Sequence, residues 1–174
     1  MRTGNTAPDL LHFPANGAVP NNPLLPAVLL HGALPPGSGP DAILDRYRAN
    51  GWTGLWTWTV FDYHHYHPAS HEALTVASGS ADLILGGPGC REIHVSSGDV
   101  LVLPAGTGHC RLAATGDFTV CGAYPPGQQN PEIVRAEGSV LRSGDFKAVA
   151  ATALPWSDPI HGAHGPLMSA WTIF

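Results

Sequence analysis

Residues 64–72 read HHYHPASHE and hold four histidines and one glutamate within nine positions. His65 and His67 are two residues apart, so on a β-strand their side chains point to the same face and can bind one ion together. A proline and a serine follow, and they allow a turn after which Glu72 can return on a neighbouring strand that faces the same interior. The stretch therefore predicts a metal site inside a β-structure.

A fifth imidazole extends this pattern from a distant part of the chain. His109 directly follows residues 104–108, which read PAGTG, and a glycine-rich loop of this kind would bring a distant strand up to the first pair. Three neutral imidazoles and one carboxylate suit one divalent transition metal: Fe, Mn, Ni, Co or Zn. Four such ligands leave one or two open positions on a five- or six-coordinate ion, where substrate, water or dioxygen would bind.

Composition indicates one globular domain with many short strands. The 174 residues are 44% hydrophobic and only 12% charged, and 21 glycines and 17 prolines supply tight turns. Lysine and arginine number only 8 and do not cluster, so a nucleic-acid partner is not expected. No apolar run is long enough for a signal peptide or a membrane span, so we expect a soluble cytoplasmic protein without a membrane partner. The three cysteines form no close pair, and neither a disulfide nor a thiolate metal site is predicted.

The chain divides into three parts that together make one domain. Residues 1–50 predict an N-terminal arm, with short extended pieces at 10–13 and 27–31, and a helix at about 40–50 that begins at a proline and stops before Gly51. We interpret this arm as lying outside the core.

Residues 51–127 predict an antiparallel barrel, and residues 128–174 a C-terminal extension that packs on it. The expected strands of the barrel, in addition to the one that carries His65, are residues 72–76, 81–85, 91–95, 99–103, 109–113 and 118–123. In the extension we expect a helix at 145–151 and an extended piece at 167–174.

Alternation with a period of two runs from Trp52 towards the histidines. The odd positions would share the inner face of one strand and the even positions the outer face, unless a bulge intervenes. Trp56 and Trp58 would then face outwards, either beneath the arm or in a dimer. We expect a two-fold homodimer with the arm or the tryptophan strand in its interface.

Together the motifs resemble those of the cupin superfamily. His65, His67, Glu72 and Gly79 match the HxH(x)4E(x)6G portion of its first motif at every spacing. The second motif, G(x)5PxG(x)2H(x)3N, is matched by four residues of this chain: Gly98, Pro104, Gly106 and His109. Thr59 replaces the leading glycine of the first motif and Ala113 the final asparagine of the second, and neither position is a ligand.

This resemblance covers about residues 55–125 and implies an all-β cupin fold, a double-stranded β-helix or jelly-roll barrel with an N-terminal arm and one or two short helices. The chain is similar to single-domain bacterial cupins without an assigned activity. The implied metal ligands are His65, His67, Glu72 and His109. The implied function is a metal-dependent enzyme acting on a small molecule, of dioxygenase or isomerase type; the alternative is a small-ligand binding or sensing module without turnover.

The sequence assigns weaker roles to several other residues. Phe61 and Tyr63 share the parity of the ligands and could line the pocket, although aromatic residues on an inner face also form ordinary core. Arg111 could hold a substrate carboxylate, or it could be a surface charge. His64 and His71 neighbour the ligand candidates and should point to the opposite faces. His94, His161 and His164 are expected at the surface. No catalytic base can be named.

Overall fold

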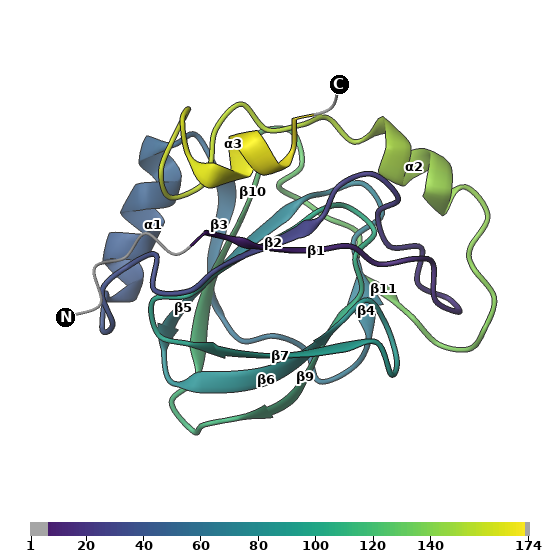
Figure 1. Cartoon of the computed structure of the whole chain (residues 1–174), viewed down its shortest axis with the longest axis horizontal. Coiled ribbons are helices and arrows are strands. Elements are labelled where there is room, and N and C mark those ends of the chain that lie inside the picture. The colour runs from purple at the N-terminus through teal and green to yellow at the C-terminus, as the bar shows by residue number, and fades with distance from the viewer. Residues whose placement is uncertain (1–6, 173–174) are drawn as a thin grey trace.

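The computed structural model describes residues 7–172, which form two antiparallel β-sheets facing each other, with three short helices at their margins (Figure 1). The six-stranded sheet has the order β1-β2-β8-β5-β10-β3, and the five-stranded sheet the order β11-β4-β9-β6-β7. This arrangement confirms the all-β jelly-roll fold expected from the sequence.

The six-stranded sheet comprises β1 (Asp9–Leu11), β2 (Ala27–Leu30), β8 (Val100–Leu103), β5 (Glu72–Ser78), β10 (Thr119–Tyr124) and β3 (Thr53–Trp58). The five-stranded sheet comprises β11 (Val134–Arg135), β4 (His65–Tyr66), β9 (His109–Ala114), β6 (Ser80–Leu85) and β7 (Arg91–Ser96). The helices are α1 (Pro40–Ala49), α2 (Asp145–Ala151) and α3 (Pro166–Ala170).

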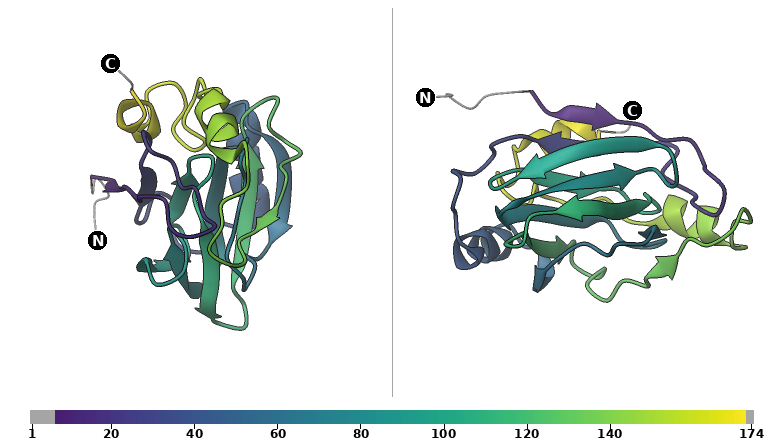
Figure 2. Two further views of the ribbon diagram at one scale, coloured as in Figure 1. Left: turned by 90° about the vertical axis from the view of Figure 1, so that its right-hand side faces the viewer. Right: turned by 90° about the horizontal axis from the view of Figure 1, so that it is seen from below.

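The five-stranded sheet has one buried face and one open face. Along β6 buried residues alternate with partly exposed ones, because successive side chains of a strand point to opposite faces. The right-hand view of Figure 2 looks onto the outer face of these teal and green strands. Their inner side chains, such as Leu83 and Val95, meet the six-stranded sheet in a cluster with Leu74 and Leu101.

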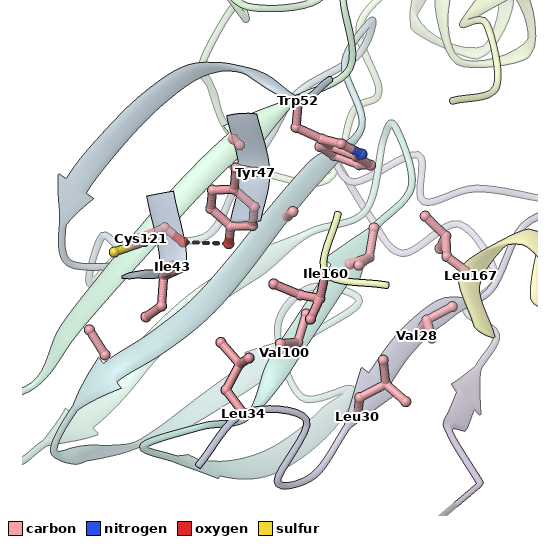
Figure 3. Packing of buried hydrophobic residues seen from close by; sticks show 14 of the residues in the cluster. Val28, Leu30, Leu34, Ile43, Tyr47, Trp52, Val100, Cys121, Ile160 and Leu167 are labelled. Atoms are coloured by element: carbon pink, nitrogen blue, oxygen red, sulfur yellow. Dashed lines mark hydrogen bonds between the residues drawn. The ribbon is translucent and has the colours of Figure 1, made fainter. Parts of the chain in front are cut away.

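The six-stranded sheet is covered on both faces. Every residue of β5 but the last is buried, because α1 and the C-terminal segment pack on the side away from the five-stranded sheet. Figure 3 shows this outer cluster, in which Ile43 and Tyr47 of α1 meet Val100 of β8, together with Leu167 of α3. The Tyr47 hydroxyl is 3.0 Å from the carbonyl oxygen of Cys121, to which it donates, and 2.6 Å from the hydroxyl of Thr75.

The segment expected as an arm contributes strands to the sheet. Strand β2 pairs with β8, β1 pairs with β2, and all four residues of β2 are buried. The interpretation that this segment lies outside the core is therefore wrong for β2. The free edge of β8 accepts the run Ala-Val-Leu-Leu, which explains how such short apolar pieces become buried without a core of their own.

Two further expectations need correction. The strand that begins after Trp52 does not continue to the histidines: β3 ends at Trp58 in one sheet, and β4 begins at His65 in the other. The irregular segment between them changes the parity, so the expected outward direction of Trp56 is wrong: its ring packs against the inner cluster. The end of the chain is also different, since residues 166–170 form α3 instead of an extended piece; residues 173–174 lie outside the described part.

Two glycines of the motifs occupy turns that other residues would not fit. Gly79 has φ of 69° between β5 and β6, and a Cβ there would collide with Thr115. Gly106 has φ of 86° in the loop before β9, and its N–H donates to the carbonyl of His67 at 2.8 Å. This second turn joins the loop before His109 directly to the strand of the first two histidines. Between residues 7 and 172, no helix has the length and apolar character needed to cross a bilayer.

Candidate metal centre

The four ligand candidates lie in or directly after three strands that meet at one end of the space between the sheets. His65 lies in β4 directly opposite His109 in β9, and the two imidazole centroids are 4.0 Å apart. His67 follows β4, and Glu72 begins β5 in the facing sheet. All four side chains are buried. The two sheets thus bring together residues that the chain separates by up to 44 positions, from 65 to 109.

The donor atoms of these side chains converge. One ring nitrogen from each of the three histidines lies within 4.8 Å of the others, close enough for a shared ion. The Oε2 atom of Glu72 is 3.3 Å from Nε2 of His67 and 3.1 Å from Nε2 of His109. In residues 7–172 no other group of three histidine, cysteine or acidic side chains lies this close together.

Backbone carbonyls fix the tautomer of each imidazole. The Nδ1 atoms of His65, His67 and His109 lie 2.9, 2.9 and 3.0 Å from the carbonyl oxygens of Tyr63, Glu132 and Thr107. A carbonyl oxygen only accepts hydrogen bonds, so each Nδ1 must carry the hydrogen, and in the neutral ring each Nε2 keeps its lone pair. This is the outer-partner arrangement typical of metal-binding histidines.

Glu72 adds a fourth acceptor to the three lone pairs. Among the described residues, its buried Oε2 has no hydrogen-bond partner, because the nearby Nε2 atoms have no hydrogen to donate. A buried carboxylate oxygen without a partner is costly, and only a cation or a proton can satisfy four converging acceptors. The site therefore fits a divalent metal ion, for which it offers three nitrogen donors and one oxygen donor.

The electrostatics of the site draw positive charge, from a proton or a cation, towards the Glu72 carboxylate. Burial, with the neighbouring His109, lowers the pKa of His65 to about 3. Burial also acts to lower the pKa of His67, but the Glu72 carboxylate outweighs it and the net direction is upward. The pKa of Glu72 lies well below its ordinary value because His67 and His109 outweigh the effect of burial. The carboxylate is thus charged at neutral pH.

A cavity of about 130 Å³ adjoins the four donors, and its wall is largely apolar. Two polar groups in it form a chain that ends at the carboxylate. The Trp56 indole N–H donates to the Tyr124 hydroxyl at 2.9 Å, and that hydroxyl donates to Oε1 of Glu72 at 3.1 Å. With Oε1 held in this way, Oε2 is left facing the imidazoles. The remaining lining residues are Trp58, Thr59, Val60, Phe61, Leu74 and Ile133.

The expected pocket residues are distributed differently. Phe61 lines the cavity, whereas Tyr63 stacks on Phe61 with ring centroids 4.8 Å apart and has the Arg135 guanidinium over its ring. Arg111 lies in a separate surface depression, where its guanidinium donates to the hydroxyl of Thr59 at 3.3 Å. Neither Tyr63 nor Arg111 is a lining residue of the cavity that holds the four donors.

The other histidines lie apart from the cavity. His71 is fully buried, accepts a hydrogen bond from the Ala105 N–H at 2.9 Å on its Nδ1, and packs against the Trp171 ring. Burial lowers the pKa of His71 to about 4. His64, whose pKa burial also lowers, is only partly buried. Three further histidines were expected at the surface: His94 pairs with Asp82 there, and His161 and His164 line a different depression.

Two cavity residues escaped the sequence analysis. Trp56 was assigned to the outer face, but its ring lies inward, across the position where Gly122 has no side chain; a Cβ there would collide with the indole. Tyr124 lies one position beyond the expected strand at 118–123, whereas β10 includes it. A usable signal existed, since Tyr124 shares the parity of Val120, an inward residue of the same strand.

The anchors of the loop before His109 were also not predicted. Asn21, a buried residue of the N-terminal segment, accepts a hydrogen bond from the Gly108 N–H at 3.0 Å, and its amide donates to the carbonyl of Gly86 at 3.0 Å. The neighbouring Asn22 amide donates to the carbonyl of Ala105 at 3.1 Å. The segment before α1 therefore holds the loop that sets the position of His109.

Comparison with known proteins agrees with this architecture. The family model for the cupin domain matches residues 59–121. The chain is also 38% identical to the uncharacterized protein YjlB of Bacillus subtilis (strain 168) over 159 residues, which cover 91% of this chain and 93% of YjlB. The chain therefore belongs to the cupin family, as the motif spacing predicted.

Solved structures with a similar fold include two bacterial proteins. One is an uncharacterized conserved protein with a double-stranded β-helix domain from Klebsiella pneumoniae, 18% identical, with a TM-score of 0.39 over 79% of this chain and 85% of that chain. The other is acireductone dioxygenase from Bacillus anthracis, with a cadmium ion in its active centre. It is 16% identical, with a TM-score of 0.34 over 48% of this chain and 56% of that chain.

Proposed function

We propose that this cupin binds one divalent transition metal ion through His65, His67, Glu72 and His109 and uses it as an enzyme on a small molecule, in a reaction of dioxygenase or isomerase type. The observation that carries the proposal is the unpartnered Oε2 of Glu72 beside three Nε2 lone pairs. A bound ion of this kind polarises an oxygen atom of the substrate or, if it is redox-active, supports oxygen chemistry. Fe, Mn, Ni, Co and Zn all suit this set of nitrogen and oxygen donors.

The protein's own residues would prepare the site for this chemistry. The carbonyls of Tyr63, Glu132 and Thr107 hold the imidazoles in the ligating tautomer. Tyr124 and Trp56 orient the carboxylate, and the apolar wall excludes water from the space beside it.

The composition of the cavity wall favours a second function, a binding or sensing module without turnover. Apart from the four donors, Tyr124 is the only titratable residue among the described residues that line the cavity. Its hydroxyl is held by Glu72, and burial raises its pKa far above neutral pH. A general base is therefore missing from this wall, which favours either chemistry performed at the ion itself or binding alone.

Metal analysis of untagged protein, purified without added metal, tests the proposal. We expect close to one ion per chain, lost in His65→Ala, His67→Ala and His109→Ala. His64→Ala is the matched control because it removes a neighbouring imidazole that does not line the cavity, and its metal content should not change. Wild-type protein without metal, even after incubation with Fe(II), Mn(II) or Zn(II), would contradict the proposal.

The two functions separate in a second measurement on the same protein. Iron-loaded protein is incubated with a panel of catechols, enediols and hydroxyaldehydes while oxygen uptake is recorded, and isomerised products are sought by NMR. Turnover that disappears in His109→Ala supports the enzyme. Saturable binding of a panel compound, without product, supports the binding module.

We also propose a homodimer in a cytoplasmic setting. Strand β3 is an edge of the six-stranded sheet, and its last residue, Trp58, is 61% exposed. An open edge beside an exposed indole is a surface that a second copy could cover. The buried free thiols of Cys110 and Cys121 suit a reducing compartment. Light scattering at micromolar concentration tests the dimer, and a monomer mass for the wild type would overturn it.

A further inference from the structure

The wall of the cavity restricts the charge of the molecule that it can accept. Beyond the four donors and Tyr124, the side chains that line it are Trp56, Trp58, Thr59, Val60, Phe61, Leu74 and Ile133. Among the described residues that line it, lysine and arginine are absent. A carboxylate or phosphate that entered the cavity would therefore have only the metal ion as its charge partner.

The charge balance of the site allows one anionic group. A divalent cation with the Glu72 carboxylate and three neutral imidazoles leaves a net charge of about +1. One anionic oxygen of a ligand neutralises that charge. A second anionic group would lie against an apolar wall without a partner, which is unfavourable in an environment of low dielectric.

The volume of the cavity restricts the size of the ligand. It measures about 130 Å³, slightly below the roughly 150 Å³ of an apolar cavity known to hold benzene. A ligand of about one six-membered ring fills such a space. Nucleotides and other larger molecules would not be enclosed by the walls as they stand.

The entrance has the same character as the wall. Trp58 and Ile133 line the cavity and are 61% and 49% exposed, so they mark where it meets solvent. Behind them, the edge of one ring meets the next: Phe61 lies 5.6 Å from Trp58 and 5.1 Å from His65 between ring centroids. The exposed indole of Trp58 gives the entrance an aromatic face on which a flat ligand could pack.

We infer that the ligand of this site is a small, flat and largely apolar molecule of about one ring, with its oxygen donors at one end and no second charged group. This inference rests on the proposed function, since the ion is the partner of the oxygen donors. It goes beyond that function because it excludes diacids, sugar phosphates and other doubly charged substrates. The ring would lie between Phe61, Leu74 and the entrance residues.

Three carboxylates with the same donor group test the inference on Co(II)-loaded protein. Benzoate has one ring and one charge, acetate has the donor without the ring, and isophthalate adds a second charge to the ring. Titrations are followed by the visible absorption of the bound cobalt. We expect benzoate to bind at least tenfold more tightly than acetate and at least tenfold more tightly than isophthalate. Equal or tighter binding of acetate or isophthalate would overturn the inference.

A variant at the entrance tests whether the lack of a cation in the wall disfavours the second charge. Ile133→Lys puts a cation at the entrance, so isophthalate should gain at least tenfold relative to benzoate. Ile133→Gln controls for the lost apolar side chain, and Leu112→Lys adds the same charge at an exposed residue that does not line the cavity. An equal gain in Leu112→Lys would show that net charge, and not the cavity wall, excludes the diacid, and would also overturn the inference.

The cobalt spectrum separates the two levels of the proposal. If the protein gives no bound-cobalt absorption, the metal site itself is wrong and the ligand class falls with it. If cobalt binds but the order of the three carboxylates differs from the expected one, the metal site stands and only the ligand class is overturned.

Discussion

The outer face of the six-stranded sheet packs against α1 and the C-terminal segment, whereas its inner face meets the second sheet and, at one end, the four metal-ligand candidates. On the outer face, buried polar groups mostly bond to one another. The Tyr47 hydroxyl has two partners, and the Trp171 indole N–H donates to the carbonyl of Pro26 at 2.8 Å. On the inner face, Glu72 keeps an oxygen without a partner.

The difference shows how one sheet separates stability from function. The residues of β5 alternate between the two faces: Leu74 and Val76 join the inner cluster, and Ala73 and Ala77 the outer one. Satisfied polar groups on the outer side cost little, whereas unsatisfied acceptors on the inner side cost stability until a cation binds. Changes on the two faces should therefore affect different measurements.

The largest effect on stability should come from the outer face. Ile43 of α1 is fully buried, and Ile43→Ala removes its contacts and leaves a cavity, so the free energy of unfolding should fall by roughly 3–4 kcal/mol. Urea unfolding of metal-free protein measures this loss. Metal content at 25 °C should not change, because the inner face is intact.

The control for this variant is Ile133→Ala, since Ile133 is half exposed at the entrance of the cavity. Its unfolding free energy should change by less than about 1 kcal/mol. If Ile43→Ala instead lost metal in the fully folded protein, the two faces would not be independent.

A change on the inner face should lower metal affinity without lowering the stability of the metal-free protein. Glu72→Gln removes the anionic donor, so metal affinity should fall by at least about a hundredfold, the upper end of what loss of an outer partner alone causes. The metal-free protein should be as stable as the wild type or more stable by about 1 kcal/mol, because the new amide can donate to Nε2 of His67 or His109.

Competition with a chelating dye measures the affinity, and urea unfolding in EDTA measures the stability. A metal-free Glu72→Gln protein that is less stable than the wild type would mean that the carboxylate is already satisfied without a cation. The unpartnered Oε2 would then no longer indicate a cation site.

The sequence predicts the parts of the fold and site that depend on residues close together in the chain. It does not predict those that depend on distant contacts. The ligand set was accessible because strand alternation places His65 and His67 on one face, and a short turn returns Glu72 to it. The path from Trp58 to His65 was not accessible. There the chain crosses from one sheet to the other, and the irregular crossing shifts the parity on which the assignment of Trp56 depended.

Distant contacts explain the other differences. Helix α3 forms where an extended piece was expected, because the buried Asp158 carboxylate accepts a hydrogen bond from the Leu167 N–H at 3.0 Å. Strand β2 is buried because β8, some 70 residues later in the chain, offers a free edge. Neither partner can be recognised from the local pattern, although the Gly165-Pro166 pair was an available signal for the start of a helix.

On the outer face, His71 is an exception because one of its buried ring nitrogens has no hydrogen-bond partner among the described residues. We expect it to have an intermediate effect, on stability at low pH. Its Nδ1 accepts from the Ala105 N–H, but its buried Nε2 has no partner among the described residues. Burial depresses the pKa from 6.5 to about 4, so between these values the unfolded chain binds a proton that the folded one does not. Stability should therefore fall as the pH drops below 6.5, by about 2 kcal/mol at pH 5.

The matched variant is His71→Asn, whose side-chain oxygen can accept from Ala105 but cannot be protonated. Unfolding of wild type and variant in EDTA at pH 7 and pH 5 isolates the contribution of His71, because the other titrating groups are common to both. The wild type should lose about 2 kcal/mol more than His71→Asn over this range. Equal losses would show that His71 titrates normally in the folded protein.

The smallest effect on metal affinity should come from loss of the Tyr124 hydroxyl, which connects the cavity wall to Glu72. Tyr124→Phe keeps the ring in the cavity but removes the donor to Oε1 of Glu72, so the carboxylate can rotate away from the imidazoles. Loss of such an outer partner typically costs tenfold to a hundredfold in metal affinity, and we expect about tenfold because both sheets still confine Glu72. Folding should hardly change, since only one hydrogen bond on each side of the hydroxyl is lost and the Trp56 N–H lies beside an open cavity.

Dye competition at pH 7 measures the affinity of Tyr124→Phe beside that of Tyr47→Phe, the corresponding change on the outer face. Tyr47→Phe leaves the carbonyl of Cys121 without the donor that α1 supplies, so it should lower the unfolding free energy by about 1–3 kcal/mol and leave metal affinity unchanged. The pair thus removes the same atom from the two faces of one sheet. If both variants lost metal equally, the separation of the faces would have to be abandoned. If only Tyr47→Phe lost metal, the orientation of Glu72 would also not depend on Tyr124.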